Sequence, residues 1–242
     1  MIASNLIKEL AFSILDRSKF RGFHLLKDLK FYASEFNLPV KNIFDVGANI
    51  GQTSTELRKY FPDALIYAFE PIDSTFEILN KNICYDPKTL LNNVALGSEE
   101  KKITIFLHDE SLINSLLNEI NVDHENNTVQ GRQTQIVQVF RGDEYCTLNK
   151  IESIFLLKTD TEGYDLDVLM GFGKLLCDRK ISFVLVEVTF DRTDLEHTSF
   201  YNVDEYMTLH GYKLSGFYDV MYYGGFKPGI SYCNCLWALV PN

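Results

Sequence analysis

IFDVGANIG, residues 43–51, is the stretch of sequence that decides the fold of this chain. Its first four residues are typical of a buried strand, and its glycines are typical of a tight turn. The polar run after Gly51, QTSTELRKYF, carries spaced apolar residues and predicts a helix. A strand, a glycine turn and a helix together form a cradle in which a ligand meets the free N–H groups of the helix start.

An acidic residue at the end of the next predicted strand narrows the kind of ligand. Glu70 closes that strand within the sequence YAFEP and follows Gly51 by 19 residues. In a strand–helix–strand unit, a carboxylate near this position accepts hydrogen bonds from ribose hydroxyls. The turn and the acid together indicate a nucleotide-like cofactor.

The chain alternates between strand-like and helix-like segments. Strands are predicted at 43–46, at a segment that ends at 70, and at 90–96, 102–107, 134–140, 154–158, 181–188, 212–217 and 232–240. Helices are predicted after Gly51, at 75–83, after Gly163 and at 203–209. This alternation predicts an α/β fold with a Rossmann-like, mainly parallel sheet, helices on both faces and an antiparallel terminal strand.

Two segments depart from the alternation. Residues 1–38 carry apolar stripes at helical spacing and are expected to form a helical lead-in, so that the α/β domain spans 39–242. Around 98–150 the pattern changes to exposed strands and indicates a hairpin-like excursion. Its polar middle, 118–132, is expected to be a mobile loop.

Composition and charge restrict the partners of the protein. The 242 residues are 46% hydrophobic and carry a formal net charge of −10, so a nucleic-acid backbone or an anionic membrane is not expected as the main partner. No apolar run is long enough to span a membrane, and the N-terminus lacks the pattern of a signal peptide. A cytoplasmic location is therefore expected, whereas the oligomeric state is not predicted.

The five cysteines are expected to be free thiols, because their number is odd and they are scattered along the chain. Cys233 and Cys235 flank a single residue of a predicted strand. We expect them to be small core residues rather than metal ligands.

Acidic residues recur at or near the carboxyl ends of predicted strands: Asp45, Glu70, Asp160 and Glu187. Parallel strands end at one edge of a sheet, and ligands collect there. We therefore expect one acidic rim. Such a rim suits a cofactor that has a positive centre and several hydroxyl or amine groups.

Four motifs give the chain a family resemblance: DVGANIG, YAFEP with a helix ending in LNKN, NNVALGS, and LKTDTEGYDLDVLMG. With them the chain resembles the FkbM-type S-adenosylmethionine-dependent methyltransferases over about residues 42–190. The resemblance implies a class I methyltransferase sheet. The chain departs from the family pattern at Asp165, where Glu is usual, and at Asp73, where a second proline is common.

The resemblance also implies which residues surround the cofactor. Gly47, Asn49 and Gly51 would form the loop beside its methionine part. Asp45 would support that loop or bind the cofactor amine through water. Glu70 would accept hydrogen bonds from both ribose hydroxyls.

Residues later in the chain are expected to contact the adenine and one further part of the cofactor. The resemblance implies that Asn93, Val94 and Ala95 lie along the adenine. Ser115, in an Asn-Ser-Leu turn, is a further candidate for contact with the cofactor.

The sulfonium of this cofactor supplies an activated methyl group, so the protein mainly orients and desolvates, and a hydroxyl acceptor needs a base or a metal. Asp160 is the first candidate for the base, and Glu162 and Glu187 either share the work or complete a carboxylate site for a divalent metal. His197, in the loop after a strand, is a further candidate base, and Lys158 is a candidate partner for one of these carboxylates. Asp160 and Glu162 are alternatively caps of the helix that follows them.

The expected function is an S-adenosylmethionine-dependent methyltransferase that methylates a hydroxyl of a sugar, glycan or secondary metabolite, so the partner is a small-molecule or glycan acceptor. Two alternatives remain. A NAD-dependent oxidoreductase shares the strand–glycine–helix–acid plan, but Asn49 and Gln52 stand where GxGxxG requires its second and third glycines. A domain that binds the cofactor without catalysis and serves in interactions is the other alternative.

Overall fold

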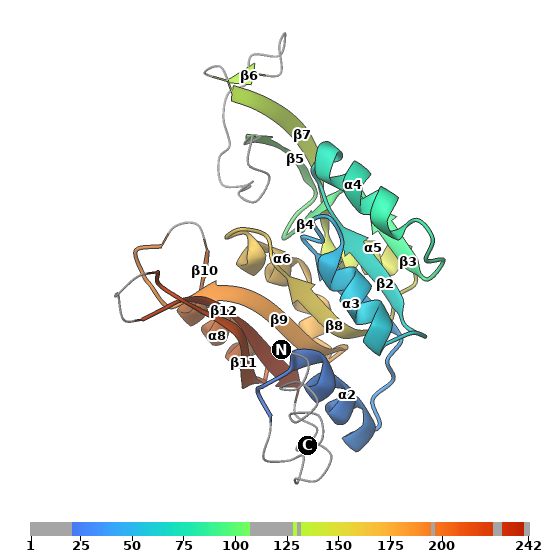
Figure 1. The fold of residues 1–242 in the computed structure, drawn as a ribbon, viewed down its shortest axis with the longest axis vertical. Helices are drawn as coiled ribbons and strands as arrows, with labels where there is room; N and C mark the ends of the chain where they lie inside the picture. The colour runs from blue at the N-terminus through green and yellow to red at the C-terminus, as the bar shows by residue number, and fades with distance from the viewer. Residues whose placement is uncertain (1–20, 107–127, 130–131, 195–196, 225–228, 240–242) are drawn as a thin grey trace, which may run out of the picture.

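A computed structural model of the chain describes residues 21–106, 128–129, 132–194, 197–224 and 229–239. Its main sheet has the strand order β11-β12-β9-β8-β1-β2-β3, with β10 paired to β9 (Figure 1). The strands are β1 (Asn42–Val46), β2 (Leu65–Phe69), β3 (Thr89–Asn92), β8 (Ile154–Thr159), β9 (Ile181–Thr189), β10 (Thr198–Ser199), β11 (Tyr212–Tyr222) and β12 (Ile230–Leu239).

The directions of these strands confirm the predicted type of sheet. β3, β2, β1, β8 and β9 are parallel neighbours. β12, the last described strand in the chain, is antiparallel to both β9 and β11. The carboxyl ends of the five parallel strands therefore meet at one edge of the sheet, where ligands bind in folds of this kind.

Helices cover both faces of the sheet because its strands are apolar on both sides. One face packs against α2 (Leu25–Glu35), α3 (Gln52–Tyr60) and α4 (Asp73–Ile83). The other packs against α5 (Gly142–Leu148), α6 (Asp165–Gly171), α7 (Gly173–Cys177) and α8 (Phe200–Leu209). β1 shows the alternation: Ile43 packs on the first face, and Phe44 and Val46 pack on the second.

A second sheet lies beside the first and has the order β4-β7-β5, with β6 paired to β7 (Figure 1). Its strands are β4 (Ala95–Gly97), β5 (Lys101–Phe106), β6 (Thr128–Val129) and β7 (Arg132–Arg141). Buried side chains of β5 and β7 form a small apolar cluster with Ile72 and Ala95. The second sheet therefore covers the segment that follows β2.

The single strand predicted at 90–96 is wrong, because the structure divides it between the two sheets as β3 and β4. Asn93 explains the break. Its side-chain amide donates to the carbonyl oxygens of Glu70 (3.1 Å) and Pro71 (3.3 Å), so the chain turns away from β2 after Asn92. Ala95 then pairs with Val139 of β7.

The structure also bears on four other expectations from the sequence, which concern the lead-in, a loop, a strand end and two cysteines. Of the lead-in, residues 1–20 lie outside the described residues, and the division at residue 38 stays a prediction. Within the expected loop 118–132, Thr128–Val129 form β6 and most other residues lie outside the described part. The strand predicted to end at Phe217 continues to Tyr222. Both Cys233 and Cys235 are buried in the core.

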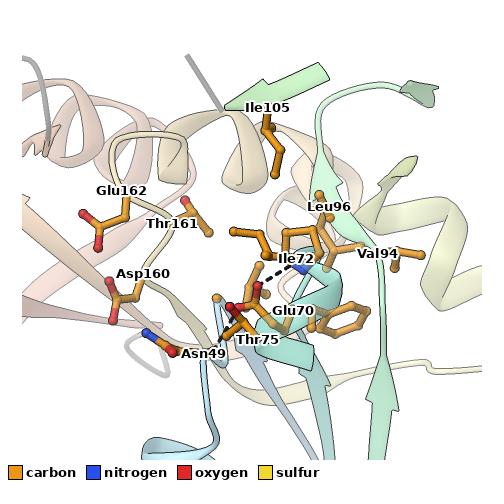
Figure 2. Close-up of a pocket in the computed structure, with 15 residues that line it drawn as sticks. Asn49, Glu70, Ile72, Thr75, Val94, Leu96, Ile105, Asp160, Thr161 and Glu162 are labelled. Carbon is orange, nitrogen blue, oxygen red and sulfur yellow. Dashed lines mark hydrogen bonds between the residues drawn. The ribbon is translucent and has the colours of Figure 1, made fainter. Parts of the chain in front are cut away.

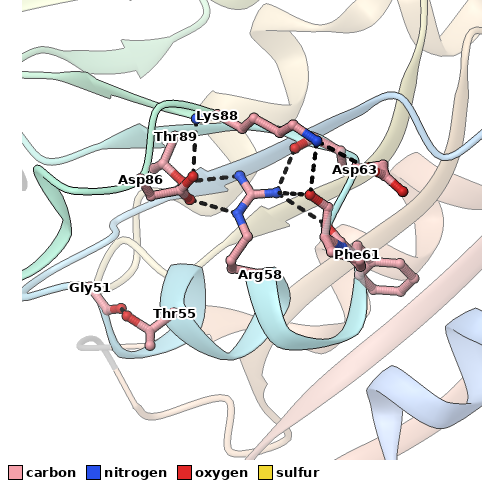
Figure 3. A network of polar contacts seen from close by, with 10 residues as sticks. Gly51, Thr55, Arg58, Phe61, Asp63, Asp86, Lys88 and Thr89 are labelled. Carbon is pink, nitrogen blue, oxygen red and sulfur yellow. Dashed lines mark hydrogen bonds and ion pairs between the residues drawn. The ribbon is translucent and has the colours of Figure 1, made fainter.

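An arginine-centred network fixes the first two strand–helix units (Figure 3). The Arg58 guanidinium, on α3, forms an ion pair with Asp86 at 2.6 Å and donates to the carbonyl oxygens of Phe61 and Ala64. It also donates to Thr89 at the start of β3. One side chain thereby joins the end of α3, the approach to β2 and the approach to β3. Among the described helices, none is long and apolar enough to cross a membrane.

The contact between Gly97 and Gly171 sets how closely the second sheet approaches α6, and it generates a testable prediction. A Cβ on Gly171 would lie 2.0 Å from the carbonyl oxygen of Gly97. We expect Gly171→Ala to lower the free energy of unfolding by about 1–3 kcal/mol, since two backbones must separate. Gly224→Ala, where a Cβ meets nothing within 4 Å, is the control and should change stability by less than about 0.5 kcal/mol. Urea unfolding measures both, and equal stability of the two variants would contradict the packing described.

Candidate active site

A cleft lies at the carboxyl ends of β1, β2 and β8, beneath the second sheet (Figure 2). Its walls come from the turn after β1, the segment after β2, the start of β4, one residue of β5 and the turn after β8. The lining residues are Val46, Gly47, Asn49, Phe69, Glu70, Pro71, Ile72, Thr75, Val94, Ala95, Leu96, Ile105, Asp160, Thr161 and Glu162.

The glycine turn after β1 is shaped by its protein neighbours. Gly47 has φ +75°, and a Cβ there would lie 1.8 Å from the carbonyl oxygen of Asp160. Gly51 has φ +96°, and a Cβ there would lie 2.5 Å from Cδ1 of Ile83. Between them Asn49 adopts a left-handed conformation with φ +48°. The turn can therefore lie against both β8 and α4 only because two side chains are missing.

Glu70 is held at the floor of the cleft by backbone groups (Figure 2). Its Oε2 accepts a hydrogen bond from the N–H of Asn49 (3.1 Å), and its Oε1 accepts one from the N–H of Ile72 (2.9 Å). Burial raises the pKa of Glu70, and the two N–H donors oppose that rise. Each carboxylate oxygen has a second lone pair, so the group can still accept hydrogen bonds from a ligand.

Lys158 is buried behind the rim and pairs with two carboxylates, of which the sequence predicted Asp160 and not Asp45. Its Nζ lies 3.0 Å from Asp45 and 3.3 Å from Asp160, and it donates to the carbonyl oxygen of Gly47 at 3.1 Å. Ser54 completes the site by donating to Asp45. Burial disfavours the ammonium charge, but the two carboxylates outweigh it and raise the pKa of Lys158. The ammonium therefore remains charged under the glycine turn.

Asp165 joins two parts of the rim, which sequence reasoning noted only as a departure from a family pattern. Its Oδ1 accepts from the N–H of Thr161 (3.1 Å), and its Oδ2 accepts from the hydroxyl of Thr198 (2.7 Å). Burial raises the pKa of this carboxyl. The N-cap residue of α6 is Tyr164. Asp160 and Glu162 therefore do not cap this helix, which was their alternative role.

Glu187 lies near the end of β9, in an acidic surrounding. Burial raises its pKa to about 8, and the carboxylates of Asp160, Glu162 and Asp165 add to the rise, whereas Lys158 opposes it. A carboxyl group with this pKa holds its proton at neutral pH and releases it in mildly alkaline solution.

The structure brings most of the predicted site residues together. Those that line the cleft are Gly47, Asn49, Glu70, Val94, Ala95, Asp160 and Glu162. Those that support its walls from behind are Asp45, Gly51 and Asn93. Glu187 and His197 lie at the adjoining ends of β9 and β10, and Ser115 lies outside the described residues.

Sequence reasoning found Val94 and Ala95 on the apolar side of the cleft but missed the rest of that side. Ile72, Thr75, Leu96 and Ile105 line it and belong to three different segments. Ile105 had a local signal, since it alternates with Ile103 on the inward side of the predicted strand KITIFL. The described residues contain no group of three or more His, Cys, Asp or Glu side chains placed to hold a metal ion.

Comparisons with known proteins found a matching family and two relatives. The family model described as Methyltransferase FkbM domain matches residues 45–214. The chain is 28% identical over 175 residues to Methyltransferase 1 of Beauveria bassiana, with 63% of this chain and 66% of that protein covered. It is 30% identical over 147 residues to Hexuronic acid methyltransferase AglP of Haloferax volcanii, with 60% of this chain and 55% of that protein covered. The matches thus span less than two thirds of either relative.

Among solved structures, the fold is similar to that of a SAM-dependent methyltransferase from Agrobacterium tumefaciens. The TM-score is 0.47 at 10% sequence identity, with 90% of this chain and 61% of that chain covered.

The buried ion pairs of Lys158 lead to a prediction about stability. Lys158→Met leaves Asp45 buried without its cation, so we expect the free energy of unfolding to fall by about 3–5 kcal/mol in urea titrations. Lys59→Met, at an exposed position of α3, is the matched control and should be nearly neutral. Adding Asp45→Asn to Lys158→Met should recover part of the loss. A stable single variant would show that the ion pair is not what holds the turn.

Proposed function

We propose that this chain, which belongs to the Methyltransferase FkbM domain family, transfers a methyl group from S-adenosylmethionine to an acceptor oxygen. The observation that carries the proposal is the composition of the cleft. A backbone turn and a carboxylate lie at its floor, apolar residues lie on one side, and an acidic turn lies opposite (Figure 2). These surroundings suit the amino-acid, ribose, adenine and sulfonium parts of one cofactor.

The residues at the floor and side of the cleft would each hold one part of this cofactor. Glu70 would accept hydrogen bonds from the ribose hydroxyls through the lone pairs that Asn49 and Ile72 leave available. Val94, with its neighbours on the apolar side, would lie along the adenine. The turn at Gly47 would meet the methionine part with its backbone groups.

The acidic turn after β8 would face the reacting end. Bound there, the cofactor supplies an electrophilic methyl group on a sulfonium centre. Asp160 and Glu162 line the cleft at this side and provide a negative surrounding for that centre. Because Lys158 pairs with Asp160, this carboxylate is fixed in place and suited to orient the cofactor and the acceptor.

A hydroxyl acceptor must also lose its proton, and Glu187 suits that task best. A general base works well when its pKa lies near the working pH, and burial raises the pKa of Glu187 to about 8. Asp160, our first candidate from the sequence, is held in an ion pair instead. We therefore assign the proton-accepting role to Glu187 and supporting roles to Asp160, Glu162 and His197.

The acceptor class follows from the proposed chemistry and from one relative. A hydroxyl of a sugar, glycan or secondary metabolite fits a site that offers a proton acceptor. The similarity to a hexuronic acid methyltransferase supports a sugar or glycan among these.

Cofactor binding is the first test of this function. Calorimetry should show binding of S-adenosylmethionine and S-adenosylhomocysteine, and no binding of NAD. Glu70→Gln should weaken the binding of S-adenosylmethionine by at least about tenfold, because a charge-assisted hydrogen bond contributes about 1.5–3 kcal/mol. Glu100→Ala, at an exposed position, is the control and should bind normally. Binding of NAD in place of S-adenosylmethionine would refute the proposal.

The pH dependence of methyl transfer tests the base. With an acceptor found in a panel of hydroxylated sugars, the rate should rise as pH passes through about 8, since the Glu187 carboxylate forms there. Glu187→Gln should lower the rate by about 100-fold or more and remove this rise, with cofactor affinity unchanged. Asp160→Asn serves for comparison and should keep the rise. An unchanged pH profile in Glu187→Gln would exclude Glu187 as the base.

A further inference from the structure

The loop before β10 holds the imidazole of His197 in a fixed orientation. One carboxylate, that of Asp194, accepts hydrogen bonds from the backbone N–H of His197 at 3.1 Å and lies 2.9 Å from its Nδ1. Since a carboxylate only accepts, this contact assigns the proton to Nδ1. The neutral ring then carries its free lone pair on Nε2.

The pairing of β10 places the backbone of His197 beside that of Glu187. In the parallel pair of β10 and β9, Thr198 lies opposite Val188. The residues immediately before these two are His197 and Glu187, and neighbouring strands lie about 4.8 Å apart. β8 pairs with β9 only as far as Val186, so β10 occupies the edge of β9 beyond the end of β8.

Tyr232 shows on which face of β9 the imidazole lies. In the antiparallel pair of β12 and β9, Tyr232 lies opposite Thr189, two residues from Glu187 and therefore on the same face. The rings of His197 and Tyr232 stack with centroids 4.8 Å apart and an interplanar angle of 15°. Burial raises the pKa of Tyr232, and the charge of Glu187 adds to this rise. The three side chains therefore share one face.

Asp165 fixes this group relative to the acidic turn. Its carboxylate holds the hydroxyl of Thr198, next to His197, and the N–H of Thr161, next to Asp160. The loop that carries the imidazole and the turn that lines the cleft are thus anchored to one buried side chain.

We propose that Asp194 is a positioning residue that presents the Nε2 lone pair of His197 to Glu187, so that the imidazole and the carboxyl group act as one proton-accepting pair. The proposal rests on the proposed function and adds two things to it: a role for Asp194, and a coupling between two groups that come from different strands.

The proton balance of the step is simple. The acceptor O–H bond breaks as the new O–C bond forms, and the bond from the methyl carbon to sulfur breaks with its electron pair left on sulfur. The proton passes to the Glu187 carboxylate, from there through water to Nε2 of His197, and then to bulk water. No oxidant, reductant or further reactant takes part.

Other titratable groups face the pair and set its charge. Asp160 and Glu162 of the turn after β8, and Asp165 of α6, raise the pKa of Glu187 beyond the rise that burial causes, and Lys158 of β8 opposes them. Tyr232 of β12 stacks on the imidazole, and Asp194 binds it from its own loop. A proton shared between Glu187 and His197 reduces the negative charge that these groups would otherwise concentrate at the rim.

Nuclear magnetic resonance tests the pair without any acceptor. In ¹⁵N-labelled protein, with the His197 signals assigned by their loss in His197→Gln, Nδ1 should carry the proton of the neutral ring. In Asp194→Asn the protein should remain folded, and the Nε2–H form should rise from a minority to the majority, because an amide group now faces Nδ1. Nε2–H as the main form in the unchanged protein would overturn the role of Asp194.

Titration of the same signals tests the coupling. The His197 shifts should show an inflection near pH 8, which reports Glu187. Glu187→Gln should remove this inflection, and Glu205→Gln, at an exposed position of α8, should keep it. The absence of an inflection near pH 8 in the unchanged protein would overturn the pair.

Failure of the Glu187–His197 pair can be distinguished from failure of the proposed function. If S-adenosylmethionine fails to bind in calorimetry, the function is refuted whatever the imidazole does. If the cofactor binds normally and the inflection near pH 8 is absent, only the pair is refuted. With an acceptor in hand, Asp194→Asn should lower kcat about tenfold, move the pH profile and leave the affinity for S-adenosylmethionine unchanged, whereas a purely structural role would not move the profile.

Discussion

The contact between the ends of β1 and β8 is the constraint on which the rest of the site depends. There the backbone of Gly47 meets the carbonyl group of Asp160 without room for a side chain, and the buried ammonium of Lys158 lies beneath both. Removing one partner of a buried ion pair costs far more than the pair itself contributes to stability. The cation, the two carboxylates and the glycine are therefore needed as a set, and they fix the position of two cleft walls.

A second constraint ties the acidic turn to the end of the sheet. Asp165 begins α6, and its two oxygens reach the backbone at Thr161 and the hydroxyl of Thr198. Because the carboxylate is buried, leaving either oxygen without a donor would be costly. The side chain has the length to satisfy both donors from the first helical residue. Asp165 is also a position at which the chain departs from the family pattern, where Glu is usual. The substitution keeps a carboxylate there.

The sequence was sufficient for the sheet and for the floor of the cleft, because both follow from local patterns. Parallel central strands are nearly continuous in apolar residues, and the acids that close them reach one edge whatever the rest of the chain does. Contacts between distant segments could not be predicted from the sequence. The break between β3 and β4 depends on where the amide of Asn93 finds two carbonyl groups, and no local pattern encodes that. The neighbourhood of Glu187 and His197 depends in the same way on the register between β9 and β10.

The charge of the rim has a consequence for the proposed methyl transfer. Methyl transfer from a sulfonium destroys a positive charge, so fixed carboxylates near the sulfur stabilise the bound reactants more than the transition state. A rim with every acid ionised would bind the cofactor tightly and slow the transfer. Lys158 offsets part of this charge, and the raised pKa of Glu187 removes another part near neutral pH. In the proposed reaction the same raised pKa would give Glu187 the basicity that an acceptor hydroxyl requires, so burial of this one carboxyl group would serve both needs.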